Sequence, residues 1–161
     1  MLIGNGDGAF QAPVTFATEN TPSSGNAPLN AKLGDVNGDG KLDIVTANYI
    51  SDNVSVLFGN GNDTFQTGVT FATGDGPRSV ALGDINGDGK LDIITANYGT
   101  NASPGSTTGV LLGNGNGTFQ AQSTFATGIQ PYSVALGDVN GDGKLDIITG
   151  NYGSGNASVL L

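Results

Sequence analysis

Three short segments of the chain carry the ligand pattern of a calcium-binding loop. They read GDVNGDGKLDI at 34–44, GDINGDGKLDI at 83–93 and GDVNGDGKLDI at 137–147. In each segment two aspartates and an asparagine alternate, so their side-chain oxygens can converge on one point, and a glycine lets the backbone turn sharply behind them. Oxygen ligands without histidine or cysteine favour Ca²⁺ over zinc or copper, and the loop supplies more protein ligands than Mg²⁺ usually takes.

Each loop offers five ligand positions within nine residues. Four of them are side-chain oxygens, and the fifth is the backbone carbonyl of a lysine whose ammonium we expect to point away. Plain Asp/Asn/Gly turns are the alternative, and three copies with the same ligand types argue against it. We expect three structural Ca²⁺ ions per chain, because no copy differs in kind from the others. The predicted ligands are Asp35, Asn37, Asp39, Lys41 and Asp43; Asp84, Asn86, Asp88, Lys90 and Asp92; and Asp138, Asn140, Asp142, Lys144 and Asp146.

The loops are not EF-hands. An EF-hand needs a glutamate at loop position twelve and a helix on each side. Position twelve is a threonine in all three copies, and the flanking residues are typical of strands. The calcium-loop chemistry is therefore expected on a β scaffold.

Composition excludes several classes of function. The net charge is −9, from 14 acidic and 5 basic residues, and nine of the acids lie in the three loops. A chain without basic patches is a poor binder of nucleic acid, and no stretch is long and apolar enough to span a membrane. The chain has no histidine and no cysteine, which removes the usual general base and thiol nucleophile. We expect a protein that is not an enzyme.

The elements that must position the loops repeat along the chain. Phe10, Phe65 and Phe119 are each followed by glutamine, which gives a period of 55 and then 54 residues. Four β-branched or aromatic stretches bounded by Gly, Asn and Asp fall in each repeat, and four strands of this period are typical of a β-propeller blade. The expected strands A to D are represented by Ser79–Gly83, Leu42–Tyr49, Val54–Phe58 and Phe65–Ala72.

We therefore expect an all-β fold in one domain, residues 1–161, with three blade-equivalents of four antiparallel strands. The repeats are approximately 4–58, 59–112 and 113–161, and the last blade is split between the C-terminus and the N-terminus. Three blades cannot close a ring by themselves, and an open arc exposes apolar faces and strand edges. The expected partner is the chain itself, as a homodimer that closes a six-bladed ring with the split blade completed in trans. A fragment of a longer propeller is the alternative.

These motifs resemble the FG-GAP/VCBS repeat family, the blades of integrin α-subunit heads and of propeller lectins. Phe58-Gly59 echoes the FG element, whereas Thr46-Ala-Asn-Tyr49 and its copies stand in place of GAP. The resemblance covers essentially the whole chain. It implies a propeller, the calcium ligands named above and a role in extracellular or cell-surface recognition, although no signal peptide is visible.

Two hypotheses for the function remain open. The first is a binding or adhesion module for a glycan or a protein; the second is a structural or engineered self-assembling scaffold without a ligand. Insertions at 21–26 and 100–108 fall on the face opposite the calcium loops, and loops that vary on a fixed scaffold often carry binding. Tyr49, Tyr98 and Tyr152 recur near that face, where they could stack on sugar rings or pack between blades. Arg78, the only arginine, could be an anchor or a solvated charge.

Overall fold

The computed structural model describes residues 4, 6–9, 11–18, 27–100 and 102–161. These residues form eleven β-strands and no helix, so they contain no helix that could cross a membrane. The strands are β1 (Pro28–Gly34), β2 (Asp43–Asn48), β3 (Asn53–Leu57), β4 (Val69–Ala72), β5 (Pro77–Gly83), β6 (Asp92–Gly99), β7 (Pro104–Leu111), β8 (Ser123–Ala126), β9 (Pro131–Gly137), β10 (Asp146–Asn151) and β11 (Asn156–Leu160).

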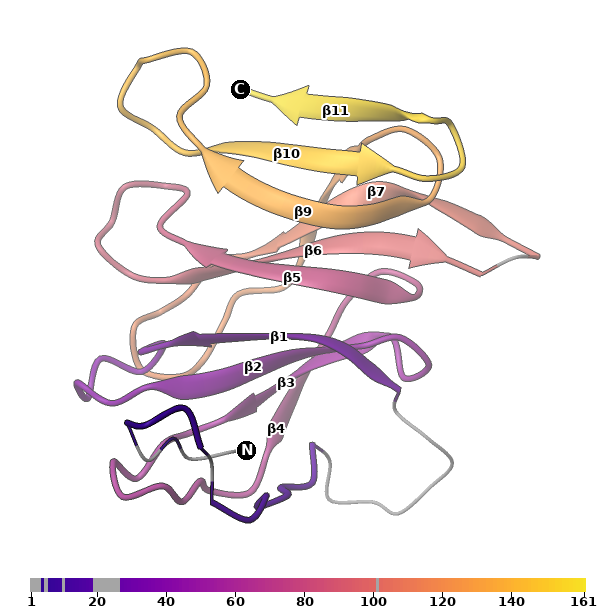
Figure 1. The fold of residues 1–161 in the computed structure, drawn as a ribbon. Helices are drawn as coiled ribbons and strands as arrows, with labels where there is room; N and C mark the ends of the chain where they lie inside the picture. The colour runs from indigo at the N-terminus through magenta and orange to yellow at the C-terminus, as the bar shows by residue number, and fades with distance from the viewer. Residues whose placement is uncertain (1–3, 5, 10, 19–26, 101) are drawn as a thin grey trace.

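The strands form three antiparallel sheets that follow one another along the chain. The first two sheets have four strands each, in the orders β1-β2-β3-β4 and β5-β6-β7-β8, and the third has the order β9-β10-β11. The sheets stack face to face, with β1 next to β5 and β5 next to β9 (Figure 1). This all-β stack of antiparallel sheets is consistent with propeller blades, each with its first strand innermost.

The predicted strands A, B and C are confirmed, but strand D is shorter than expected. It was predicted over Phe65–Ala72, whereas β4 begins only at Val69, and Phe65 makes an isolated bridge to Gly59. Between the Val56–Val69 pair and this bridge, the chain before β4 has one more residue than the chain after β3, so the β4 side carries a bulge. Such a bulge ends regular pairing, and the N–H of Gln66 bonds the carbonyl of Phe58 at 2.8 Å instead.

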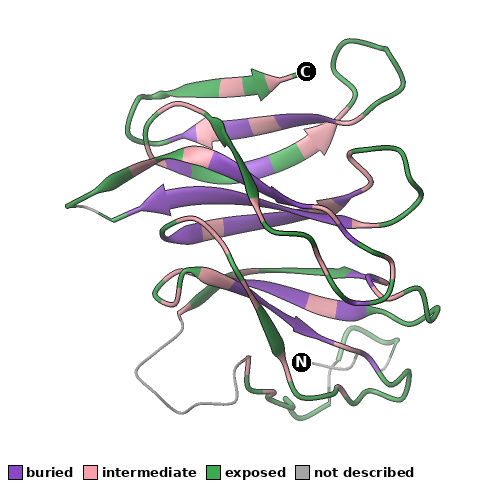
Figure 2. Ribbon diagram, turned by 180° about the vertical axis from the view of Figure 1, so that it is seen from behind, coloured by how far each residue is buried: buried purple, intermediate pink, exposed green. Residues whose placement is uncertain are grey.

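Two apolar layers fill the spaces between the sheets. Val45, Val54 and Val56 of the first sheet pack with Val80 and Ile93 of the second sheet. A second layer joins the second and third sheets in the same way. The middle sheet is covered on both faces, and all eight residues of β6 are buried, whereas β8 and most of β11 are exposed (Figure 2). The two outermost sheets of the stack each have one outer face, and residues 11–18 lie over part of the outer face of the first sheet, where Phe16 meets Phe65.

The insertion predicted at 100–108 does not form an irregular loop. It lengthens the β6–β7 hairpin, in which Gly99 pairs with Pro104 and the N–H of Thr100 bonds the carbonyl of Ser103 at 2.9 Å. The hairpin grows because Thr108 and Thr107 continue the ladder opposite Ala96 and Asn97. The insertion predicted at 21–26 lies outside the described residues.

Candidate metal centres

The three aspartate loops (35–43, 84–92 and 138–146) lie at the same end of the sheets, each joining the first strand of a sheet to the second (Figure 1). In the first loop, Asp35 Oδ1 accepts the N–H groups of Gly38 at 2.7 Å and Asp39 at 3.2 Å. Its Oδ2 accepts the N–H of Gly40 at 2.8 Å. Asn37 Oδ1 accepts the same Asp39 N–H at 2.9 Å, so oxygens of Asp35 and Asn37 meet at one amide.

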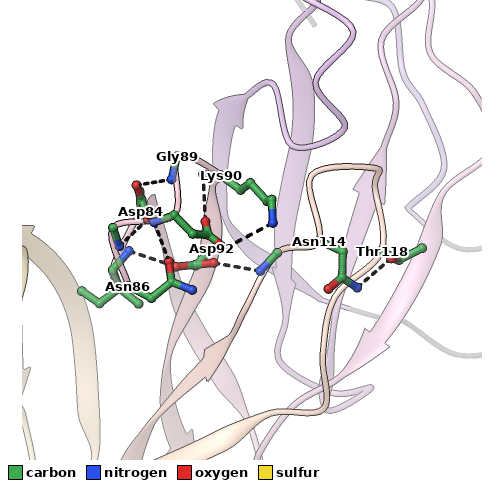
Figure 3. Close-up of polar contacts among 11 residues, drawn as sticks. Asp84, Asn86, Gly89, Lys90, Asp92, Asn114 and Thr118 are labelled. Atoms are coloured by element: carbon green, nitrogen blue, oxygen red, sulfur yellow. Dashed lines mark hydrogen bonds and ion pairs between the residues drawn. The ribbon is translucent and has the colours of Figure 1, made fainter.

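The second loop repeats this arrangement (Figure 3). Asp84 Oδ1 accepts the N–H groups of Gly87 at 2.8 Å and Asp88 at 3.0 Å. Asp84 Oδ2 accepts the N–H of Gly89 at 2.7 Å, and Asn86 Oδ1 accepts that of Asp88 at 3.0 Å. Both glycines have positive φ, 75° and 82°, which a side chain at either position would disfavour. The residues that do the same in the third loop are Asp138, Asn140, Gly141, Asp142 and Gly143.

The aspartate at the ninth position has a different environment. Asp43 is fully buried, and its two oxygens accept the N–H groups of Val36 at 3.0 Å and Gly59 at 2.9 Å. Asp92 bonds Ile85 and Gly113 in the same way. The structure thus brings oxygens of Asp35 and Asn37 together at the backbone N–H of Asp39, whose own carboxylate accepts the N–H of Lys41 in the same turn, and engages the fourth predicted side chain with the strands. Within the described residues, no three carboxylates gather closely enough to hold an ion by themselves.

The lysine side chains do not point away from the loops, contrary to our prediction. Lys41 Nζ lies 3.6 Å from Asp39 Oδ2, Lys90 Nζ lies 3.3 Å from Asp88 Oδ2, and the third loop repeats the pair at 3.9 Å. In this structure the ammonium is the nearest counter-charge to an exposed carboxylate, and the attraction brings them together.

The carboxylates at the first and ninth positions differ in how readily they ionise. Burial opposes ionisation of Asp35, but the bonds from Gly40, Gly38 and Asp39 outweigh it and lower its pKa. In the third loop the bond from Gly143 is the main cause that lowers the pKa of Asp138. Burial raises the pKa of Asp43, and the nearby negative charges add to the rise. The turn thus favours negative charge at its entrance, where a cation would be held.

Comparison with known protein families agrees with the repeat pattern. The FG-GAP-like repeat matches residues 35–95 and 98–149, and the FG-GAP repeat matches residues 76–118. The chain belongs to the FG-GAP repeat family. The matches to FG-GAP repeats begin at the first aspartate loop and end within β10 of the third sheet. No curated protein matches the chain at a significant level.

The donors of the FG-GAP aspartate loops suit a hard cation. A carboxylate oxygen that accepts one N–H keeps a lone pair, so the bonds to Asp35 and Asp39 leave acceptor capacity at both groups. Asp39 is exposed, and Asp35 and Asn37 are partly exposed, so an ion from solvent can reach them. Asp43 fits less well, because both of its oxygens face amides of the strands. The first three side chains of each loop therefore fit the ion, and the fourth supports the loop from below.

The Thr-Ala-Asn-Tyr segments, which replace GAP in these FG-GAP repeats, form a polar network that the sequence did not reveal. Asn48 is fully buried, and its Nδ2 donates to Asn53 Oδ1 at 2.7 Å and to Ser55 Oγ at 2.6 Å. Thr46 Oγ1 donates to Asn48 Oδ1 at 3.1 Å. Asn97 and Asn151 occupy the same position in the other sheets. The sequence does contain a signal for this network, because a Thr followed two residues later by an Asn recurs in three strands.

The tyrosine row (Tyr49, Tyr98, Tyr132 and Tyr152) lies at the end of the FG-GAP sheets opposite the aspartate loops. Successive rings are 6.3, 6.0 and 6.1 Å apart. Arg78 lies over the Tyr132 ring, 3.9 Å from its centre, and its Nη2 donates to the Tyr132 hydroxyl at 2.7 Å. Arg78 is thus held in a cluster of aromatic rings and is not a solvated charge. Tyr132, which we did not single out from the sequence, lies at the centre of the row.

Proposed function

We propose that this chain is a non-enzymatic calcium-binding β-propeller module for extracellular recognition. The observation that supports it best is that one Asp-x-Asn-x-Asp turn is built with the same hydrogen bonds at the same end of all three sheets. A catalytic centre needs one differentiated site, whereas a structural ion is expected once per blade. Calcium in each turn would hold the connection between the first and second strands.

Ca²⁺ would be held by the Asp, Asn and Asp oxygens of each loop and the carbonyl of its lysine. For the first loop these are Asp35, Asn37, Asp39 and Lys41, whereas Asp43, the fourth side chain predicted from the sequence, supports the loop through its bonds to Val36 and Gly59. Bound calcium supplies positive charge among the carboxylates, and three ions change the net charge from −9 to −3. With free calcium at about twenty times the Kd, each site adds roughly 1.8 kcal/mol to the stability, and three add about 5 kcal/mol.

The recognition surface in this proposal is the tyrosine row with Arg78, and the ligand class is carbohydrate. Tyr132 and Tyr152 are 46% and 71% exposed, and the pocket beside them is also lined by the exposed Asn156. Aromatic faces bind the apolar faces of sugar rings, and the amide nitrogen of Asn156 can donate to a sugar hydroxyl group. A scaffold without a ligand is the second candidate, and the same assay separates the two.

A matched pair of triple variants tests the calcium proposal. Asp39→Asn, Asp88→Asn and Asp142→Asn together remove one predicted ligand charge from each loop. Asp7→Asn, Asp63→Asn and Asp75→Asn remove the same total charge from exposed positions outside the loops. We expect millimolar calcium to raise the Tm of the parent and of the second variant, and to raise that of the first variant much less. An equal rise in all three proteins, or none in the parent, would contradict the proposal.

Glycan-array screening in millimolar calcium tests the recognition proposal. We expect the parent to bind a defined set of sugars and the Tyr132→Ala variant to bind them at least tenfold more weakly. The control is Tyr132→Phe, which keeps the aromatic ring and should retain most of the binding. Absence of any bound sugar would favour the scaffold without a ligand, and equal binding by Tyr132→Ala would place the ligand elsewhere.

A further inference from the structure

The junction between consecutive sheets is built from one glycine and two leucines. Gly34, at the end of β1, faces Leu82 and Leu91 of the second sheet, and a Cβ at Gly34 would lie 2.9 and 2.8 Å from their methyl groups. The glycine is needed because these leucines occupy the space of a side chain. The second junction has the same composition. The corresponding residues there are Gly83, Leu136 and Leu145.

The two outer faces of the stack each carry one half of this junction. On the first sheet Leu33 and Leu42, which correspond to the leucine pair, are 62% and 60% exposed. On the third sheet Gly137 corresponds to the glycine, and a Cβ there would meet nothing within 4 Å. Val139 and Val159 beside it are 56% and 52% exposed, whereas their counterparts in the first sheet are buried. The leucine pair and the bare glycine are complementary, and they lie at opposite ends of one chain.

The outer strands are also complementary at the two ends of the stack. Among the described residues the third sheet has no fourth strand beside β11. Residues 11–18 have the sequence of a fourth strand, and they lie against the first sheet: Phe16 meets Phe65 edge-to-face at 5.1 Å. Phe71, on the fourth strand β4, meets Phe119 of the second sheet in the same way at 5.0 Å. Phe16 is therefore placed as if on the outer strand of a sheet that would precede the first.

At the other end of the stack the equivalent positions are open. Phe125 on β8 corresponds to Phe71, but it is 46% exposed and lines a pocket of about 470 Å³ with Leu160 and Leu161. Asp146 corresponds to Asp43 and Asp92. It is buried and accepts the N–H of Val139 at 2.9 Å, but within the described part of the chain it has no bond from a hairpin glycine like those that Asp43 and Asp92 receive.

We infer that a second copy of this chain docks head-to-tail on the third sheet. Leu33 and Leu42 of the partner subunit pack on Gly137, and residues 11–18 of the partner subunit run beside β11 as the missing fourth strand. The period places Gly4 of the partner subunit where it can donate its N–H to Asp146, as Gly59 does to Asp43. A different protein would have to reproduce both halves of a junction that this chain already contains.

Two copies joined in this way form two identical junctions and six sheets. A heterologous junction generates a closed ring when its rotation divides a full turn, and a filament when it does not. Figure 1 shows the N-terminal and C-terminal segments at opposite ends of the stack, so one chain does not bring its own halves together. Of the predicted junction residues, Leu33 and Gly137 lie on strands, whereas Leu42 lies in the aspartate loop directly before Asp43, so a calcium ion in that loop would also help to hold the junction.

Light scattering of the purified chain, with and without EDTA, tests the inference. One chain is 16.0 kDa, so the closed pair is expected at about 32 kDa, twice that mass. The variant Gly137→Val should have the mass of one chain and an unchanged circular dichroism spectrum, because in one chain nothing lies within 4 Å of the new Cβ. The matched variant Gly83→Val should instead lower the Tm, because there the Cβ meets two leucines.

A second variant keeps the test independent of the glycine. Leu33→Ser with Leu42→Ser removes the other half of the junction at exposed positions, and it should also have the mass of one chain. Mixing it with Gly137→Val should restore a pair, because one intact junction forms between the two. A parent of one-chain mass, a parent larger than two chains, or variants that stay paired would each overturn the inference. A parent protein that binds calcium but has the mass of one chain would overturn the inferred pairing and would leave the proposed function unaffected.

Discussion

The carboxylate of Asp43 accepts the N–H of Gly59 at 2.9 Å, which fastens the aspartate loop to the hairpin that follows β3. Asp43 also accepts the N–H of Val36 inside its own loop. Asp92 makes the corresponding pair of bonds to Gly113 and Ile85. The ninth position of each complete loop therefore connects two turns of one sheet, a role separate from those of the exposed positions.

The variant Asp92→Ala should lower the free energy of unfolding by about 2 kcal/mol, because it leaves two amides without an acceptor and one of these bonds is buried. Urea unfolding in EDTA measures the loss without a calcium contribution. Asp88→Ala is the control, since its carboxylate is exposed and bonds the backbone only within its turn. Equal losses for the two variants would show that the ninth position has no special structural role.

The buried asparagine network should contribute to stability as strongly as a core residue. Asn48→Ala removes the partner of Asn53 and Ser55 and opens a small cavity, and we expect a loss of about 2–3 kcal/mol. Asn114→Ala removes an exposed bond to Thr118, shown in Figure 3, and should cost less than about 1 kcal/mol. The comparison is made by thermal and urea unfolding. A loss at Asn48 no greater than that at Asn114 would contradict the structure.

The contact between Arg78 and Tyr132 should be measurable as a coupling energy. A double-mutant cycle with Arg78→Ala and Tyr132→Leu isolates it, because both side chains are partly exposed and the single changes leave the sheets intact. We expect a favourable coupling of about 1 kcal/mol from the stacked guanidinium and the bond to the hydroxyl. A cycle with Tyr152 in place of Tyr132 is the control. Zero coupling at Tyr132 would show that Arg78 is solvated.

Acid should remove the stabilising contribution of Asp88. Burial opposes ionisation of this carboxylate, but its bonds from Lys90 and Asn86 outweigh that effect and lower its pKa below the ordinary 3.8. The stability due to a lowered pKa is present above 3.8 and is lost as pH falls through the folded-state value. In EDTA, the difference in stability between the parent and Asp88→Asn should therefore be constant near neutral pH and shrink on acidification.

Asp92 should show the opposite trend. Burial is the largest cause that raises its pKa, and the charges of Asp88 and Asp84 add to the rise. A raised pKa contributes stability below 3.8 that is lost as pH rises through the folded-state value. The pH dependence of the Asp92→Asn difference should therefore have the sign opposite to that of Asp88→Asn. Parallel curves for the two variants would contradict the assigned environments.

The strands and their order could be predicted because the same pattern of strands and turns recurs in each of the three repeats. β-Branched runs between Gly and Asn turns locate the first three strands, and the tight turns fix their pairing. The bulge between Phe65 and Val69 could not be predicted, since a single extra residue on one strand leaves no mark in the hydrophobic pattern. The same limit explains why the inserted residues at 100–108 were expected as a loop and form a longer hairpin.

The sequence indicated which residues share each turn, but it did not indicate the separate contacts that each of them makes. Alternating Asp and Asn residues in one turn identify the oxygens that meet, as Asp35 and Asn37 do. That Asp43 would bond Gly59 could not be known, because the hairpin glycine is brought near only by sheet pairing. The lysine ammonium was misplaced because its position follows from the balance of local charges. Arg78 and Tyr132, which lie on neighbouring sheets, are likewise joined only by the stacking of the fold.

Equilibrium dialysis of the intact chain against calcium, with bound metal counted per chain, tests the central claim most directly. The account predicts three calcium ions per chain in the parent protein. It predicts two when one loop carries both Asp84→Asn and Asp88→Asn, because the other two loops keep their own ligands. Fewer than one ion per chain at millimolar calcium, or an unchanged count in that variant, would contradict the claim that the aspartate loops are calcium sites.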